Sequence, residues 1–147
     1  MSYVFVAGTF NVFHDGHKRL LDKALEVQRE NDGSAIIVGV TTDEYARTHK
    51  DVPVDNLWIR GLRVDVYLRS KGYPFGLIWP IDGPGIPPDF PTSRDDVLVC
   101  ASDTKDNAMD ALATIPEERR PRMVVIWRDP AMPSSSDIIR SMSTGNE

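Results

Sequence analysis

Five short apolar runs divide the chain, and stretches with helical periodicity or loop composition separate them. The runs are rich in β-branched and aromatic residues and cover residues 3–7, 35–40, 76–81, 97–101 and 123–127, where we expect buried parallel strands. Helical patterns cover residues 16–31, 43–49, 55–71 and 104–114, and a further short helix is expected to start near Ser136. This alternation predicts an α/β fold, a single Rossmann-like doubly wound domain over residues 1–147 with a five-stranded parallel sheet.

Residues 82–91 contain too many prolines and glycines for a helix or a strand, which predicts a long surface loop. The ligand of an open α/β sheet lies beyond the carboxyl ends of its strands, where the strand order reverses. If the first strand is central, the segment that follows it therefore lies in this crevice.

Composition narrows the classes of function. The net charge of −5 argues against a nucleic-acid-binding surface, because such domains are usually basic. No apolar run approaches the length that spans a bilayer, and no charged-then-apolar leader is present, so we expect a soluble, cytoplasmic protein without membrane partners. The one cysteine, Cys100, follows apolar residues and is expected to be a small core residue.

The segment from Ala7 to Lys18 joins the first apolar run to the first amphipathic one and predicts a nucleotide-phosphate site. A helix N-terminus presents unpaired N–H groups and the positive end of the helix dipole, which stabilise an anion. Gly8 and Gly16 let backbone approach that anion, and two histidines three residues apart can face the same way. These histidines could instead be caps or half of a metal site, whereas the P-loop and G-x-G-x-x-G phosphate cradles are absent from the sequence.

Several motifs resemble one group of enzymes. His14-Asp15-Gly16-His17 resembles the H-x-G-H signature of the cytidylyltransferase-like nucleotidyltransferase superfamily. Residues 133–140 lie where that superfamily has an I-S-S-T-x-I-R element. Within this superfamily, the chain looks most like the archaeal-type phosphopantetheine adenylyltransferases. This resemblance lies in the opening of the chain, in residues 38–46 and in residues 99–104.

The resemblance implies transfer of AMP from ATP to 4′-phosphopantetheine, which releases pyrophosphate and forms dephospho-coenzyme A. The implied partners are ATP and a phosphorylated small molecule, and the implied cofactor is Mg²⁺ carried in with the nucleotide. Whether the chain forms a homo-oligomer stays open. By the same resemblance, His14, His17 and Lys50 are catalytic; Gly8, Thr9, Phe10, Gly16, His17, Arg60, Ser134, Ser135, Ser136 and Arg140 bind the nucleotide; and Thr9, Asn11 and Lys50 bind the acceptor.

Alternatives stay open for the function. A cytidylyltransferase acting on glycerol 3-phosphate or another small phosphorylated acceptor would share the H-x-G-H core. A nucleotide-binding regulator that has lost turnover is an alternative of another class.

Alternatives also stay open for particular residues. Either Arg60 or Arg63 is expected to face the site, and the register of the serines at residues 134–136 is open because Asp137 replaces the usual Thr in one alignment. The tryptophans at positions 58, 79 and 127 are expected to be packing residues, although Trp127 ends a predicted strand on the ligand side and could border a base.

Overall fold

A five-stranded parallel sheet forms the centre of the computed structural model, which describes residues 2–31, 34–49, 53–83, 85–86 and 90–127. The strands are β1 (Tyr3–Gly8), β2 (Ala35–Thr41), β3 (Leu77–Ile81), β4 (Val97–Ala101) and β5 (Arg122–Ile126). Their order is β3-β2-β1-β4-β5, and every neighbouring pair is parallel. The predicted fold class is therefore confirmed, and each strand boundary lies within one residue of its prediction.

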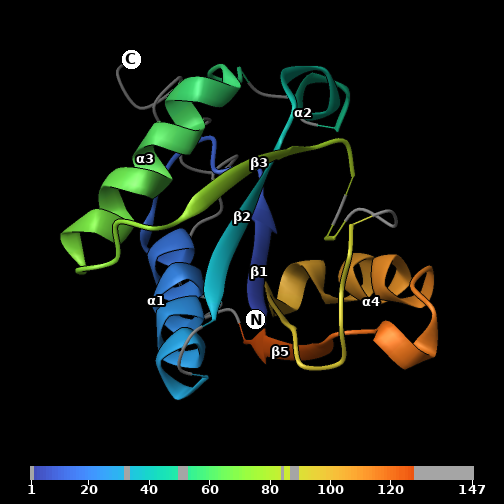
Figure 1. The fold of residues 1–147 in the computed structure, drawn as a ribbon. Helices are drawn as coiled ribbons and strands as arrows, with labels where there is room; N and C mark the ends of the chain where they lie inside the picture. The colour runs from blue at the N-terminus through green and yellow to red at the C-terminus, as the bar shows by residue number, and fades with distance from the viewer. Residues whose placement is uncertain (1, 32–33, 50–52, 84, 87–89, 128–147) are drawn as a thin grey trace, which may run out of the picture.

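The helices lie on both faces of the sheet. Figure 1 shows α1 (Asp15–Glu30) and α3 (Leu57–Ser70) on one side and α4 (Lys105–Ala113) on the other, while α2 (Asp43–His49) lies beyond the end of β2. Two 3₁₀ turns, Ser102–Thr104 and Glu117–Arg119, flank α4. No helix among these is both long and apolar enough to cross a membrane. The helix predicted near Ser136 lies outside the described residues.

Strand parity divides the core between the two faces of the sheet. Val4 and Val6 of β1 pack in the cluster that contains α1 and α3, whereas Phe5 between them packs with α4. Successive side chains of a strand point to opposite faces, so burial on both sides requires the continuous apolar runs seen in the sequence. Cys100 lies in the second cluster as expected, and burial raises the pKa of its thiol.

The prediction of a simple surface loop at residues 82–91 is wrong for two of the residues that the structure describes. Ile86 is buried, and the ring of Phe90 packs edge-on against Phe5 and Trp79 at centroid distances of 5.2 and 5.7 Å. Apolar side chains of this segment thus cover part of the sheet opposite α1 and α3, so lack of regular structure does not imply exposure.

Trp58 and Trp127 depart from the expected role of the tryptophans as packing residues, whereas Trp79 packs against Phe90. Trp58 is 80% exposed on α3, Trp127 is 69% exposed after β5, and Trp79 on the edge strand β3 is about half exposed. Trp58 shares a face of α3 with Leu62 and Val66, which are exposed as well, because the opposite face of this helix is the one that packs on the sheet.

The strand order confirms that β1 is central. The chain proceeds from β1 outward to β2 and β3, and then returns to the other side of β1 to form β4 and β5. The order therefore reverses between β1 and β4, which is where open α/β sheets bind their ligands. The loop after β1 begins at this reversal point.

Candidate active site

The loop between β1 and α1 has an unusual backbone at Phe10. This residue has a φ of +53°, the left-handed region that is costly for residues other than glycine. Its ring is buried and packs over Gly8, where an added Cβ would lie 3.1 Å from Cε2 of Phe10. The sequence prediction made Phe10 a nucleotide ligand, but its side chain belongs to the core, so only its backbone could contact a nucleotide.

Two arginines of α3 hold the carbonyl groups on either side of Phe10. Nη1 of Arg60 donates to the carbonyl oxygen of Thr9 at 2.9 Å, and Nη1 of Arg63 donates to that of Asn11 at 2.6 Å. A strained residue persists only where its surroundings fix it, and these two bonds fix both of its neighbours. We refer to Arg60 and Arg63 as the arginine pair.

Arg60 is completely buried, and its guanidinium donates hydrogen bonds to groups of the protein itself. Besides Thr9, its guanidinium donates to the carbonyl oxygen of Asp55 at 2.7 Å, to Oδ1 of Asp43 at 2.8 Å and to Oγ1 of Thr41 at 3.3 Å. The predicted role of Arg60 in nucleotide binding therefore needs correction, because a buried cation with these partners holds the loop instead.

Arg63 also contacts protein groups. Its Nη2 lies 2.6 Å from Oδ2 of Asp55, in an ion pair whose two side chains are both partly exposed. The question of which arginine faces the site thus has a different answer from the one expected, since both arginines bind the segments that build it.

Asn11 joins the loop to the segment before α3. Its Nδ2 donates to the carbonyl oxygen of Pro53 at 2.7 Å, and its Oδ1 accepts from the backbone N–H of Asp55 at 2.9 Å. An amide provides both the donor and the acceptor that these two bonds need, whereas a carboxylate would offer acceptors alone, which explains why Asn suits this position. The side chain is 3% exposed and its two ends are engaged, so its predicted contact with the acceptor is not supported by its placement.

The two histidines cap α1 reciprocally. His14 is the N-cap residue, and its Nδ1 accepts from the backbone N–H of Gly16 at 3.0 Å. The Nδ1 of His17 in turn accepts from the backbone N–H of His14 at 3.4 Å. A neutral imidazole that accepts through Nδ1 carries its hydrogen on Nε2, so each ring is set to donate through Nε2. We refer to His14 and His17 as the histidine pair.

Aromatic neighbours fix the position of the rings. The imidazoles are stacked with centroids 3.9 Å apart, and His17 also contacts Phe10 at 5.1 Å and Phe13 at 5.8 Å. The two imidazoles are therefore held as one stacked pair at the start of α1.

Gly16 is required for this arrangement by its lack of a side chain. An added Cβ would lie 2.8 Å from Cε1 and 3.0 Å from Nδ1 of His14, which is closer than such contacts occur. The glycine of the H-x-G-H motif therefore makes room for the first histidine ring in this chain.

The structure brings together part of the predicted site. Gly8, Thr9, His14, Gly16 and His17 all lie at or directly after the carboxyl end of β1. Lys50, Ser134, Ser135, Ser136 and Arg140 lie outside the described residues. Thr41 and Asp43 were not predicted as site residues, although both stand in the block over residues 38–46 that carries part of the family resemblance.

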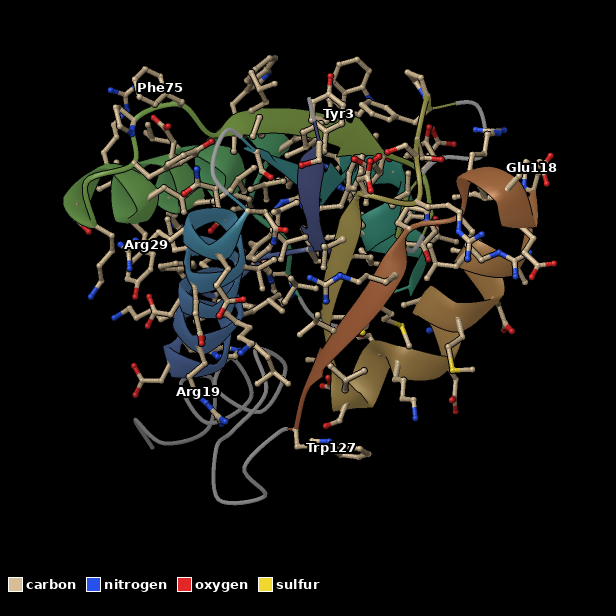
Figure 2. The ribbon with its side chains drawn as sticks, turned by 60° about the horizontal axis from the view of Figure 1, so that its bottom comes forward. Tyr3, Arg19, Arg29, Phe75, Glu118 and Trp127 are labelled. Carbon is tan, nitrogen blue, oxygen red and sulfur yellow. The ribbon has the colours of Figure 1, made fainter. Side chains whose placement is uncertain are left out.

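Trp127 lies at the same end of the molecule as the start of α1, as Figure 2 shows by the neighbouring labels of Arg19 and Trp127. Nη2 of Arg19 donates to the carbonyl oxygen of Trp127 at 3.2 Å, and Nζ of Lys105 lies 5.6 Å from the centre of its ring. Tyr3, at the start of β1, is labelled at the opposite end. An exposed indole thus lies on the expected ligand side of the sheet.

Within the part of the chain that the structure describes, no group of three or more His, Cys, Asp or Glu side chains could hold a metal ion. The described site offers the positive end of the α1 dipole and two imidazole donors, a set that suits anionic phosphate oxygens.

Comparison with known proteins agrees with this chemistry. Residues 5–64 match the family model for cytidylyltransferase-like proteins. Phosphopantetheine adenylyltransferase of Methanothermobacter thermautotrophicus is 41% identical to the chain over 70 residues, which cover 48% of this chain and 39% of that protein. Glycerol-3-phosphate cytidylyltransferase of Bacillus spizizenii is 44% identical over 45 residues, 31% of either chain. The matches thus span well under two thirds of these relatives.

A solved structure covers more of the chain. A protein of unknown function from Archaeoglobus fulgidus superposes with a TM-score of 0.67 at 28% sequence identity, over 85% of this chain and 98% of that one. The similarity therefore extends beyond the strands and helices that the family model matches.

Proposed function

We propose that this chain, whose residues 5–64 match the cytidylyltransferase-like family model, is a nucleotidyltransferase that transfers AMP from ATP to 4′-phosphopantetheine. The products are pyrophosphate and dephospho-coenzyme A. The reciprocal histidine cap carries the proposal, since it places two imidazoles that accept through Nδ1 at the start of α1, close to the point where the strand order reverses. The similarity to archaeal phosphopantetheine adenylyltransferases supports the choice of acceptor.

The reaction needs no protein nucleophile. A phosphate oxygen of the acceptor attacks the α-phosphorus of ATP in line, the bond to the bridging oxygen breaks, and pyrophosphate leaves with the electron pair. Catalysis then consists of positioning two anions and stabilising the charge that develops between them. Nε2–H groups of His14 and His17 donate to oxygens of the α-phosphate, and Lys50 contributes positive charge.

Thr9 and the N-terminus of α1 hold the phosphate of the acceptor in this proposal. Thr9 is partly exposed directly after β1, and Arg60 fixes its backbone carbonyl. The helix begins one residue after the N-cap His14, so the positive end of its dipole acts on the same anions. The C-terminal serines at residues 134–136 and Arg140 would bind the β- and γ-phosphates.

Mg²⁺ would enter with the nucleotide, held by triphosphate oxygens rather than by a cage of protein carboxylates. When bound, it would lower the repulsion between the two anionic substrates. Mg²⁺ prefers hard oxygen ligands such as those of phosphate. The imidazoles of His14 and His17 would then donate hydrogen bonds to the phosphates and would not bind the metal ion. Chelation should therefore abolish turnover and leave the thermal stability of the protein without nucleotide unchanged.

A second candidate is a cytidylyltransferase that acts on glycerol 3-phosphate. The match to the Bacillus spizizenii enzyme supports this candidate by its 44% identity over 45 residues. The Methanothermobacter thermautotrophicus enzyme is 41% identical over the longer stretch of 70 residues. The sequence preceding the C-terminal serines, Trp127-Arg128-Asp129-Pro130, lacks the R-T-x-G-I-S-T-T ending usual in such enzymes, which favours the adenylyltransferase. A regulator without turnover would have no use for two donors directed at a transferring phosphate.

One experiment separates the three candidates. Pyrophosphate release is measured with ATP or CTP, each combined with 4′-phosphopantetheine or glycerol 3-phosphate. We expect the fastest release from ATP with 4′-phosphopantetheine. Faster pyrophosphate release from CTP with glycerol 3-phosphate would overturn both the proposed nucleotide base and the proposed acceptor. Nucleotide binding without pyrophosphate release in any combination would indicate the regulator.

A further inference from the structure

A line of polar groups lies behind Thr9, and it begins in the core. Arg60 of α3 is completely buried and donates from Nη1 to Oγ1 of Thr41 at 3.3 Å. Thr41 is the last residue of β2 and is 5% exposed. Its Oγ1 in turn lies 3.0 Å from Oγ1 of Thr9, which is partly exposed at the end of β1.

The direction of these hydrogen bonds follows from the chemistry of arginine. A guanidinium has only donors and keeps its charge at any physiological pH, so Oγ1 of Thr41 must accept from Arg60. The single hydroxyl hydrogen of Thr41 is then available for Oγ1 of Thr9, which is the bond that the structure shows. Oγ1 of Thr9 accepts, and its own hydrogen consequently points away from Thr41.

We propose that Thr41 is a positioning residue that, with Arg60 behind it, orients the hydroxyl of Thr9 as a donor to a phosphate oxygen of the acceptor. The inference rests on the proposed function, in which Thr9 holds that phosphate. Chains of hydrogen bonds polarise one another, so a cation at the buried end strengthens the donor at the open end. Asp43, which pairs with Arg60 at 2.8 Å, holds the guanidinium in place.

A purely structural role for Thr41 makes a different prediction. Its hydroxyl would then serve only to satisfy Arg60, whose other donors already reach Thr9, Asp55 and Asp43. Loss of the hydroxyl would lower stability but would affect both substrates alike, and its effect would not depend on the side chain at position 9.

The test compares Thr41→Val, which removes the hydroxyl at nearly constant shape, with Thr41→Ser, which keeps it. We expect Thr41→Val to raise KM for 4′-phosphopantetheine about tenfold, the worth of one hydrogen bond, while KM for ATP changes less than about twofold. Thr41→Ser should restore the wild-type KM. In a Thr9→Val background, Thr41→Val should add no further loss, because the group it orients is gone.

Three results would overturn the proposal: full additivity with Thr9→Val, an equal loss for ATP and acceptor, or no rescue by serine. Melting temperatures of all variants identify any that fail to fold, in which case Thr41→Ala, which also removes the hydroxyl, replaces Thr41→Val in both backgrounds.

A second readout separates this inference from the proposed function. Binding of inorganic phosphate is followed by calorimetry in the same variants. If the wild type does not turn over 4′-phosphopantetheine but binds phosphate, and Thr41→Val weakens that binding only when Thr9 is present, the acceptor is wrong and the positioning role stands. If the wild type binds neither ligand, Thr9 has no phosphate to donate to, and both proposals are overturned.

Discussion

The histidine pair at the start of α1 and the arginine pair on α3 look equivalent in the sequence, because both offer candidate ligands for phosphate. The structure uses them differently. Each histidine binds the protein through an acceptor nitrogen, Nδ1, and retains a donor at Nε2. Each arginine binds the protein through its donors, which are the groups that a phosphate would need. Positive charge near a phosphate site therefore does not by itself identify a phosphate ligand.

His17→Ala tests the histidine half of this comparison and should have the largest effect. Loss of one preorganised donor to a developing charge typically lowers kcat by about 10²–10³. We expect such a fall in steady-state turnover, with the affinity for ATP little changed. Lys23→Ala, which removes an exposed ion pair with Glu26 farther along α1, is the matched control and should retain full activity. Weaker ATP binding with unchanged turnover would instead make His17 a ground-state ligand.

Arg60→Gln and Arg63→Gln test the arginine half by their unequal effects on stability. Removing a buried cation that pairs with Asp43 should cost about 3 kcal/mol of the free energy of unfolding. Arg63 is partly exposed, and its replacement should cost about 1 kcal/mol. Urea denaturation of both variants measures the difference. Equal stability of Arg60→Gln and the wild type, combined with weaker ATP binding, would return Arg60 to the nucleotide site.

Gly16→Ala sharpens the comparison by moving a histidine without removing it. The new Cβ would lie 2.8 Å from Cε1 of His14, so the ring must shift. Misplacement of a positioned group by about 1 Å can cost about 10² in rate, and we expect kcat to fall by up to that factor. The melting temperature should hold or rise, since alanine is otherwise favoured over glycine in a helix. Unchanged kcat would show that the position of His14 is not critical.

Tyr67→Phe changes a contact between α1, which carries the histidine pair, and α3, which carries the arginine pair. We expect it to have the smallest effect. The phenol of Tyr67 on α3 donates to Oδ1 of Asp22 on α1, and its ring contacts Phe13 beside His17. Partial burial and then the bond to Asp22 raise the pKa of Tyr67 to about 12. The unfolded chain loses this proton near pH 10, so the contribution of the group to stability is complete below pH 10 and is lost as the pH rises toward 12.

Thermal unfolding of the wild type and Tyr67→Phe between pH 8 and 12 measures this contribution. The gap between the two melting temperatures should narrow at the alkaline end. A gap that is constant with pH would show that the phenol contributes by packing alone.

The fold could be predicted from the sequence because strands buried on both faces leave continuous apolar runs. β4 illustrates this, since its boundaries match the prediction at both ends. The histidine pair was also predictable in outline, because the motif, the preceding glycine and the start of the amphipathic pattern coincide at residues 14–17.

The targets of the arginines and of Asn11 could not be predicted in the same way. Their partners are backbone carbonyl and N–H groups, which every residue has, so no side-chain pattern marks them. Phe10 gave no signal either, because its left-handed backbone depends on contacts from α3, about fifty residues later in the chain. Nothing in the sequence distinguishes Thr41 from other threonines at the end of a strand. Only the fold shows that it lies between Arg60 and Thr9.

The central claim is that the site transfers the nucleotidyl group and not a phosphoryl group. It is tested most directly by incubating the protein with 4′-phosphopantetheine, Mg²⁺ and ATP that is radiolabelled either at the α- or at the γ-phosphorus. We predict that the α-label appears in dephospho-coenzyme A and the γ-label in pyrophosphate, and that His17→Ala slows both together. Transfer of the γ-label to the acceptor, or loss of the α-label as free AMP with no labelled product, would contradict the account.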